Sequence, residues 1–139
     1  MVSLESNKTL VRRWYDEFVN EHDVDVLDNL LAPGFASHFL SDAPGRTRDE
    51  LKEIDGRMFA SFPDLRIAVD DMVAEGDRVA VRYSSQGTHR GDALGVPATG
   101  QAAEGTGMDF FRIADGKLAE RWAELDFTGL LVQIGAVPG

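Results

Sequence analysis

The hydrophobic periodicity of the chain changes at Pro63, and this change limits the folds that it can adopt. Before Pro63, apolar residues recur at the three- and four-residue spacing of amphipathic helices. After Pro63, apolar and polar residues alternate, as they do in strands that bury one face. Helices followed by an antiparallel meander predict one α+β domain over residues 1–139, a length that can bury a sizeable core.

Three helices are expected in the first part of the chain. The first carries the apolar positions of residues 10–19, with Ser6 as its N-cap. The second begins after Asp23, carries the apolar residues Val26, Leu27, Leu30 and Leu31, and stops at the Pro33-Gly34 pair. The third follows a capping box, Thr47–Glu50, in which the two side chains satisfy each other's free backbone donors.

Strands are expected from residue 65 onward, with a short extended piece earlier at residues 35–40. The alternation slips at Asp70-Asp71, which predicts a β-bulge. Residues 88–100 are rich in glycine and longer than an ordinary hairpin loop, which favours a pocket rim over an exposed hairpin tip. Asp115-Gly116 predicts a type I′ turn between the last two strands.

Composition and charge narrow the classes of function. The 14 basic and 24 acidic residues give a formal net charge of −10, which disfavours a nucleic-acid partner. The absence of cysteine excludes disulfides and thiolate metal sites, and three dispersed histidines lack metal-ligand spacing, so no metal is expected. No apolar run approaches the ~20 residues of a membrane span. The N-terminus lacks a signal-peptide pattern, so we expect a cytoplasmic protein without membrane contact.

Counting outward from a two-residue turn pairs Asp109 with Trp122 and Gly105 with Asp126. One face of the hairpin then mixes Asp109 and Asp126 with Phe111 and Trp122, where apolar surroundings would raise carboxyl pKa values towards neutrality. The alternative is that this face meets water, and a bulge in the hairpin would exchange the faces. The opposite face is also partly apolar, which predicts that a second subunit covers it in a homodimer.

Most of the chain resembles one protein family in residues that recur in order and spacing. The segments that carry the resemblance are Gly87–Gly91, Gly95–Gly100, Gly107–Ile113, Asp115–Trp122 and Asp126–Gly135. Together they resemble the SnoaL-like polyketide cyclases. The resemblance implies the cone-shaped α+β fold of nuclear transport factor two, a curved sheet wrapped around helices and a deep pocket.

The resemblance also implies a chemistry. Founding members of the family close a ring by intramolecular aldol condensation on an aromatic polyketide, without metal or cofactor. Asp126 occupies the place of the family's general acid/base. More distantly, Asp109 and Tyr15 resemble acid and oxyanion residues of ketosteroid isomerase, which shares the fold.

We therefore expect Asp126 and Asp109 to be catalytic, with a pocket around the small-molecule substrate. The candidate substrate-binding residues are Trp122, His38, Tyr15, Trp14, His89, Phe111 and Phe59. Because Trp14 and Tyr15 are adjacent on a helix, one is expected to face the pocket and the other the core. Two rival functions stay open, namely a hydroxylase of the same fold and a non-catalytic homodimer that binds a small molecule. A hydroxylase would consume oxygen, and a binding module would release its ligand unaltered.

Overall fold

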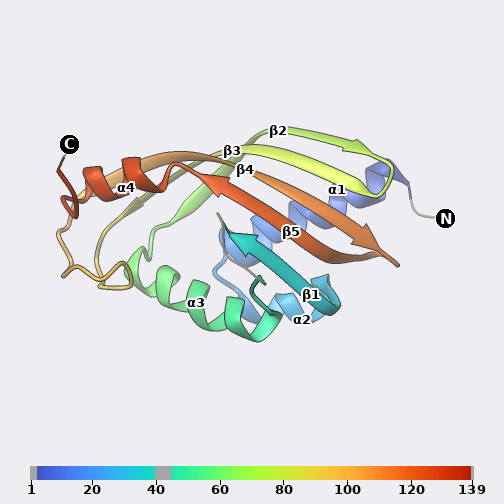
Figure 1. The fold of residues 1–139 in the computed structure, drawn as a ribbon, viewed down its shortest axis with the longest axis horizontal. Coiled ribbons are helices and arrows are strands. Elements are labelled where there is room, and N and C mark those ends of the chain that lie inside the picture. The colour runs from blue at the N-terminus through green and yellow to red at the C-terminus, as the bar shows by residue number, and fades with distance from the viewer. Residues whose placement is uncertain (1–2, 40–44, 139) are drawn as a thin grey trace.

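The computed structural model describes residues 3–39 and 45–138, which form a curved five-stranded sheet with helices packed against it (Figure 1). In chain order the elements are α1 (Leu4–Arg13), the π-helical segment η1 (Trp14–Val19), the 3₁₀ turn η2 (Val24–Val26), α2 (Leu27–Leu30), β1 (Leu31–Phe39), α3 (Arg48–Ser61), β2 (Arg66–Glu75), β3 (Arg78–Thr88), β4 (Ala102–Ala114), β5 (Lys117–Leu125) and α4 (Phe127–Gln133). The α+β class expected from the sequence is confirmed.

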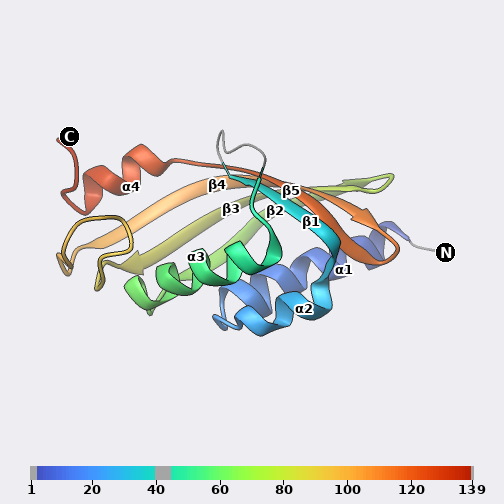
Figure 2. The same ribbon diagram turned by 60° about the horizontal axis from the view of Figure 1, so that its bottom comes forward.

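The strands lie in the order β1-β5-β4-β3-β2, with β1 parallel to β5 and the other pairs antiparallel. Figure 2 shows α1, α2 and α3 on one face of the sheet, which we call the inner face, and the opposite one is the outer face. The main core lies between these helices and the inner face. In the described part of the chain, no helix combines the length and apolar content needed to cross a membrane.

Some of the observed helix ends lie where the sequence predicts them, and others do not. The Thr47 capping box opens α3 as expected, with Glu50 bonded back to the cap backbone. The N-cap of α1 is Ser3, which forms a capping box with Ser6, so the expectation for Ser6 was three residues late. The second helix ends at Leu30, earlier than expected, because the chain is already extended at the start of β1. The expected extended piece lies within β1 as far as Phe39, and its last residue, Leu40, lies outside the described residues.

The first helix changes from α to π geometry at Trp14, a change that the apolar spacing did not reveal. The wider turn ends with the backbone N–H of Asn20 donating to the carbonyl of Tyr15. Both Trp14 and Tyr15 line the cavity between the sheet and the helices, so the expectation that only one of them faces the pocket was wrong. Single π turns are rare and frequently lie at functional sites.

The final hairpin has the expected turn and an unexpected register. Asp115 and Gly116 both have positive φ values, 51° and 73°, as a type I′ turn requires. Ile113 pairs with Leu118, but the next pair is Arg112 with Glu120, so β5 holds one extra residue at this point. The bulge expected near Asp70 is also present, between Val69 and Asp71.

The bulge in β5 exchanges the faces of its remaining residues. Asp109 therefore pairs with Ala123 and Phe110 with Trp122, so the predicted pairing of Asp109 with Trp122 was wrong. Trp122 lies on the outer face with Phe110, whereas Arg121 shares the inner face with Asp109. One inserted residue thus replaces an aromatic neighbour of Asp109 with a cationic one.

We expect Thr47→Ala to lower the free energy of unfolding by about 1 kcal/mol, because it removes the acceptor that satisfies the backbone N–H of Glu50. Chemical denaturation monitored by circular dichroism measures this loss. Thr9→Ala is the matched control, because Thr9 is exposed inside α1 and alanine suits a helix interior. Equal stability of Thr47→Ala and the wild type would contradict the role of this cap.

Candidate active site

An apolar cavity of about 320 Å³ opens between the inner face and the helices. Its walls come from η1, α3, the inner faces of β3, β4 and β5, and the start of α4. A smaller lobe of about 140 Å³ adjoins it and shares Tyr83, Leu125 and Leu130 as lining. Cavities of this size and apolar character are typical of small-molecule sites.

Three polar residues meet at the inner wall of the cavity. The hydroxyl of Tyr15 donates a hydrogen bond of 2.5 Å to Oδ2 of Asp109. Nη2 of Arg121 lies 2.9 Å from Oδ1 of the same carboxylate, and Asp109 is only 3% exposed. Oδ1 of Asp109 and Nε of Arg121 are buried and, apart from the ion pair itself, make no hydrogen bond with any described residue.

Arg121 is fixed by three different elements. Its Nη1 donates to the hydroxyl of Ser37 on β1 at 3.1 Å, and its guanidinium carbon lies 4.9 Å from the ring centroid of Trp14. Burial is the largest single influence on Arg121 and lowers its pKa, but Asp109, the two tyrosines and Asp55 together outweigh burial, so the net pKa is raised. The guanidinium therefore stays protonated and keeps one orientation.

Two tyrosines complete this end of the cavity. Burial, reinforced by the charge of Asp109, raises the pKa values of Tyr15 and Tyr83 well above the ordinary value for a phenol. Both hydroxyls therefore remain protonated, and that of Tyr15 donates to Asp109. Gly107 makes room for Tyr83, since a Cβ there would lie 2.4 Å from the tyrosine oxygen.

A second carboxylate, Asp55, lines the cavity from α3. Burial raises the pKa of Asp55 to about 6, and Asp109 adds to the rise while Arg121 and Arg46 oppose it. The sequence analysis missed Asp55, although a signal was present. Asp55 lies four residues after Leu51 and four before Phe59, so it is an acidic residue in the apolar stripe of a helix.

The glycine-rich loop contributes Ala93 and Leu94 to the cavity lining, in agreement with its expected place at the rim. His89 is fully buried at the base of this loop, where Nδ1 accepts from the backbone N–H of Thr99 at 3.2 Å. Gly91 packs against Ser61 so closely that a Cβ would meet its backbone at 2.8 Å. His89 therefore ties the two ends of the loop together while Gly91 lies against α3, and His89 does not line the cavity.

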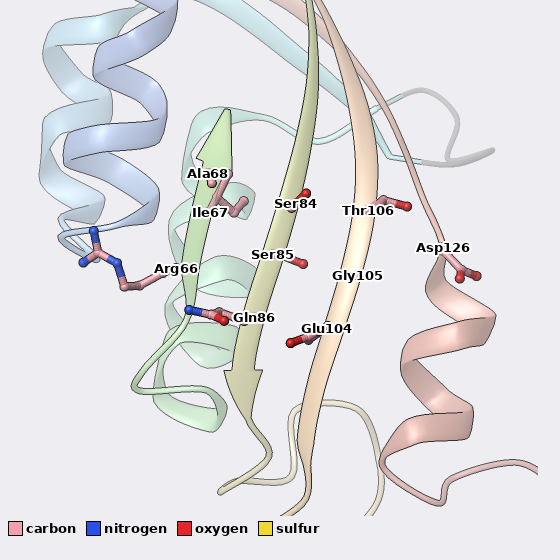
Figure 3. Close-up of a pocket in the computed structure, with 10 residues that line it drawn as sticks. All are labelled: Arg66, Ile67, Ala68, Ser84, Ser85, Gln86, Glu104, Gly105, Thr106 and Asp126. Carbon is pink, nitrogen blue, oxygen red and sulfur yellow. The ribbon is translucent and has the colours of Figure 1, made fainter. Parts of the chain in front are cut away.

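Asp126 lies elsewhere. It is the N-cap of α4, where its carboxylate accepts from the backbone N–H of Gly129 at 2.9 Å, and it is exposed. Figure 3 shows it at the start of α4, bordering a groove of about 560 Å³ whose other lining comes from β2, β3 and β4. Asp126 also borders the smaller lobe, but it does not line the main cavity with Asp109. Its expected position beside Trp122 and Asp109 in an enclosed hollow was wrong.

Trp122 and His38 lie on the outer face, away from the cavity. Their rings stack with centroids 5.6 Å apart, and Nε2 of His38 lies 2.7 Å from Oε2 of Glu120. That hydrogen bond, helped by Arg112, lowers the pKa of Glu120. Trp122 and His38, which were expected to bind substrate, therefore lie on the opposite side of the sheet from Asp109 and Phe111.

The other candidates lie on the inner side of the sheet. Trp14, Tyr15 and Phe59 line the cavity. Phe111 is fully buried behind it, with its ring centroid 5.5 Å from that of Trp14. In the described residues no group of three metal-ligating side chains comes together.

Comparisons with known proteins agree with this architecture. The family model of SnoaL-like polyketide cyclases matches residues 9–134. A SnoaL-like polyketide cyclase, so assigned provisionally, from Jannaschia sp. CCS1 is 29% identical, with 99% of this chain and 98% of that chain covered and a TM-score of 0.89. A search of curated proteins finds no match to the sequence.

Two further solved structures differ in their assigned reaction. IdmH from Streptomyces antibioticus, provisionally a polyketide cyclase, is 32% identical over 93% of this chain and 98% of that chain, with a TM-score of 0.79. AclR from Streptomyces galilaeus, provisionally a hydroxylase, is 27% identical over 98% of this chain and 100% of that chain, with a TM-score of 0.88. One fold therefore accommodates relatives with different assignments.

We expect Asp55→Asn to be more stable than the wild type at pH 7.5, by a margin that shrinks towards pH 4. The folded wild type holds the Asp55 proton up to about pH 6, whereas the unfolded chain releases it near pH 4, so stability falls as pH rises through this window. Thermal unfolding at a series of pH values measures the margin. Glu53→Gln, an exposed change on the same helix, is the control, and parallel curves for Asp55→Asn and wild type would contradict the expectation.

Proposed function

The chain belongs to the SnoaL-like polyketide cyclase family, and from this premise we propose that it is an enzyme that closes a ring by intramolecular aldol condensation. The proposed substrate is an aromatic polyketide-type molecule with neighbouring carbonyl groups, and no cofactor takes part. The observation that supports this proposal most is the cluster of Tyr15, Asp109 and Arg121 at the wall of an apolar cavity.

In this mechanism, Asp109 takes a proton from the carbon between two carbonyls. The carbanion is delocalised as an enolate, whose negative charge is stabilised by the nearby guanidinium of Arg121 in the cavity lining. The enolate carbon attacks a second carbonyl, a C–C bond forms, and the carbonyl oxygen becomes an alkoxide that takes up a proton. The apolar walls hold the substrate folded, and such positioning alone lowers a barrier by several kcal/mol.

The two rival functions differ from this proposal in their requirements. A hydroxylase must consume oxygen, whereas an aldol cyclisation does not, so an oxygen electrode separates the two. A binding module has no need of a buried carboxylate, because burying a charge costs free energy unless it is paired. Asp55 lines the apolar wall without a hydrogen bond or ion pair to any described residue, and this favours catalysis over passive binding.

We expect Asp109→Asn to lower the turnover of an aromatic 3-oxo ester by on the order of 10²-fold or more, because an amide cannot accept the proton. Product formation followed by chromatography measures the loss. Asp126→Asn is the matched control, since asparagine caps a helix about as well as aspartate and should leave turnover near the wild-type rate. A loss in Asp126→Asn with none in Asp109→Asn would instead support the assignment of Asp126 drawn from the family resemblance.

We also propose that a second copy of the chain covers the outer face. One row across this face runs through Val73, Phe110, Trp122 and His38. Val73 and Phe110 are 64% and 42% exposed, and Met108 nearby is 59% exposed. A contiguous exposed apolar patch on a sheet is typical of a subunit interface.

We expect light scattering at micromolar concentration to give the mass of two chains for the wild type and of one chain for Phe110→Glu, because a buried unpaired carboxylate would oppose association. Leu4→Glu, a matched change at an exposed leucine of α1, should remain a dimer. A monomeric wild type would refute the proposal for this face.

A further inference from the structure

We propose that Asp55 is the second catalytic carboxyl group of the cavity, the one that donates the proton to the new alkoxide. This inference rests on the proposed cyclase function and deepens it by dividing acid and base between two residues. Asp55 lies on α3 and lines the cavity together with Asp109 and Arg121 of the sheet.

The surroundings of Asp55 differ from those of Asp109. Asp109 is paired with Arg121 and bonded by Tyr15, whereas Asp55 makes no hydrogen bond or ion pair with any residue in the described ranges 3–39 and 45–138. It is half-buried, so it remains reachable from the cavity and from solvent. A polar side chain in an apolar wall without a partner is costly, and such groups are found where function needs them.

The charges that face Asp55 come from three other parts of the molecule. Arg121 on β5 and Arg46, which precedes α3, favour its ionised form, while Asp109 on β4 opposes it, and burial opposes it most. The balance leaves the pKa of Asp55 at about 6, so protonated and ionised forms coexist near neutral pH. A carboxyl group in this range is suited to give up a proton, which leaves the role of proton acceptor to the other carboxylate of the cavity, Asp109.

The proposed reaction consists of two proton transfers and the formation of one C–C bond. The substrate C–H proton goes to Asp109, the enolate carbon bonds to the second carbonyl carbon, and the resulting alkoxide takes the O–H proton of Asp55. After product release, water carries a proton from Asp109 to Asp55. No oxidant, reductant or second substrate is required.

The first experiment is the pH profile of turnover for an aromatic 3-oxo ester between pH 5 and 8. We expect kcat of the wild type to fall above about pH 6 as Asp55 ionises, and Asp55→Asn to lower kcat at pH 6 by on the order of 10²-fold and to abolish this limb. Asp55→Glu should recover part of the rate and restore a limb, which a merely structural role would not do. Glu53→Gln should leave the profile unchanged. A wild-type limb that persists in Asp55→Asn would overturn the assignment while leaving the cyclase proposal intact.

A second experiment does not depend on turnover. We expect the affinity for 1,8-dihydroxyanthraquinone, an aromatic polyketone probe, to fall roughly tenfold between pH 5 and 8, because ionised Asp55 no longer donates to a carbonyl. Asp55→Asn keeps an N–H donor at every pH, so its affinity should be constant over this range. Fluorescence titration measures both proteins. If the wild type turned over no 3-oxo ester but showed this affinity change, the cyclase proposal would fail and contact of Asp55 with ligands would stand. A constant wild-type affinity would overturn the contact.

Discussion

The buried ion pair between Asp109 and Arg121 is the constraint around which the cavity is built. Moving two charges out of water costs several kcal/mol per ion, and their attraction repays this only with good geometry and further hydrogen bonds. Here those supports come from Tyr15, Ser37 and the face of Trp14. They belong to η1 and β1, which are far from β4 and β5 in sequence, so the pair requires most of the fold to be in place.

Two irregular elements make this arrangement geometrically feasible. The extra residue in β5 turns Arg121 to the inner face, where it can reach Asp109. The π turn of η1 brings Trp14 and Tyr15 inward together, one beneath the guanidinium and the other bonded to the carboxylate. Regular versions of either element would remove a partner and leave a buried charge uncompensated, which costs more than the irregularity itself. The local departures from ideal geometry and the polar site therefore have a common physical cause.

The sequence predicted the elements well because local signals determine them. Helical spacing, the Thr47 capping box, the Asp115-Gly116 turn and the slip at Asp70 each act within a few residues. The site was predicted only in part, because its composition depends on which side chains of β5 point to the inner face. Side chains alternate along a strand, so one inserted residue exchanged Trp122 for Arg121 as the inner neighbour of Asp109. No local feature of Leu118–Arg121 marks the insertion, whereas Asp55 could have been found as an acid in an apolar stripe.

Asp126 and the glycine-rich loop, which lie in the segments that resemble the family, position parts of the cavity wall. Asp126 caps α4, which places Leu130 against the cavity, and Gln133 fixes the same helix through hydrogen bonds of 2.7 and 2.8 Å to the backbone of Glu104. His89 and Gly91 hold the loop that brings Ala93 and Leu94 to the rim. These residues determine the shape of the walls, while Asp55, Asp109, Arg121 and the two tyrosines supply charge and donors within them. Cavity shape and cavity charge thus depend on different residues, so a substitution in the walls can change which molecule fits without altering the charged groups. This separation provides a physical route by which relatives of one fold acquire different reactions.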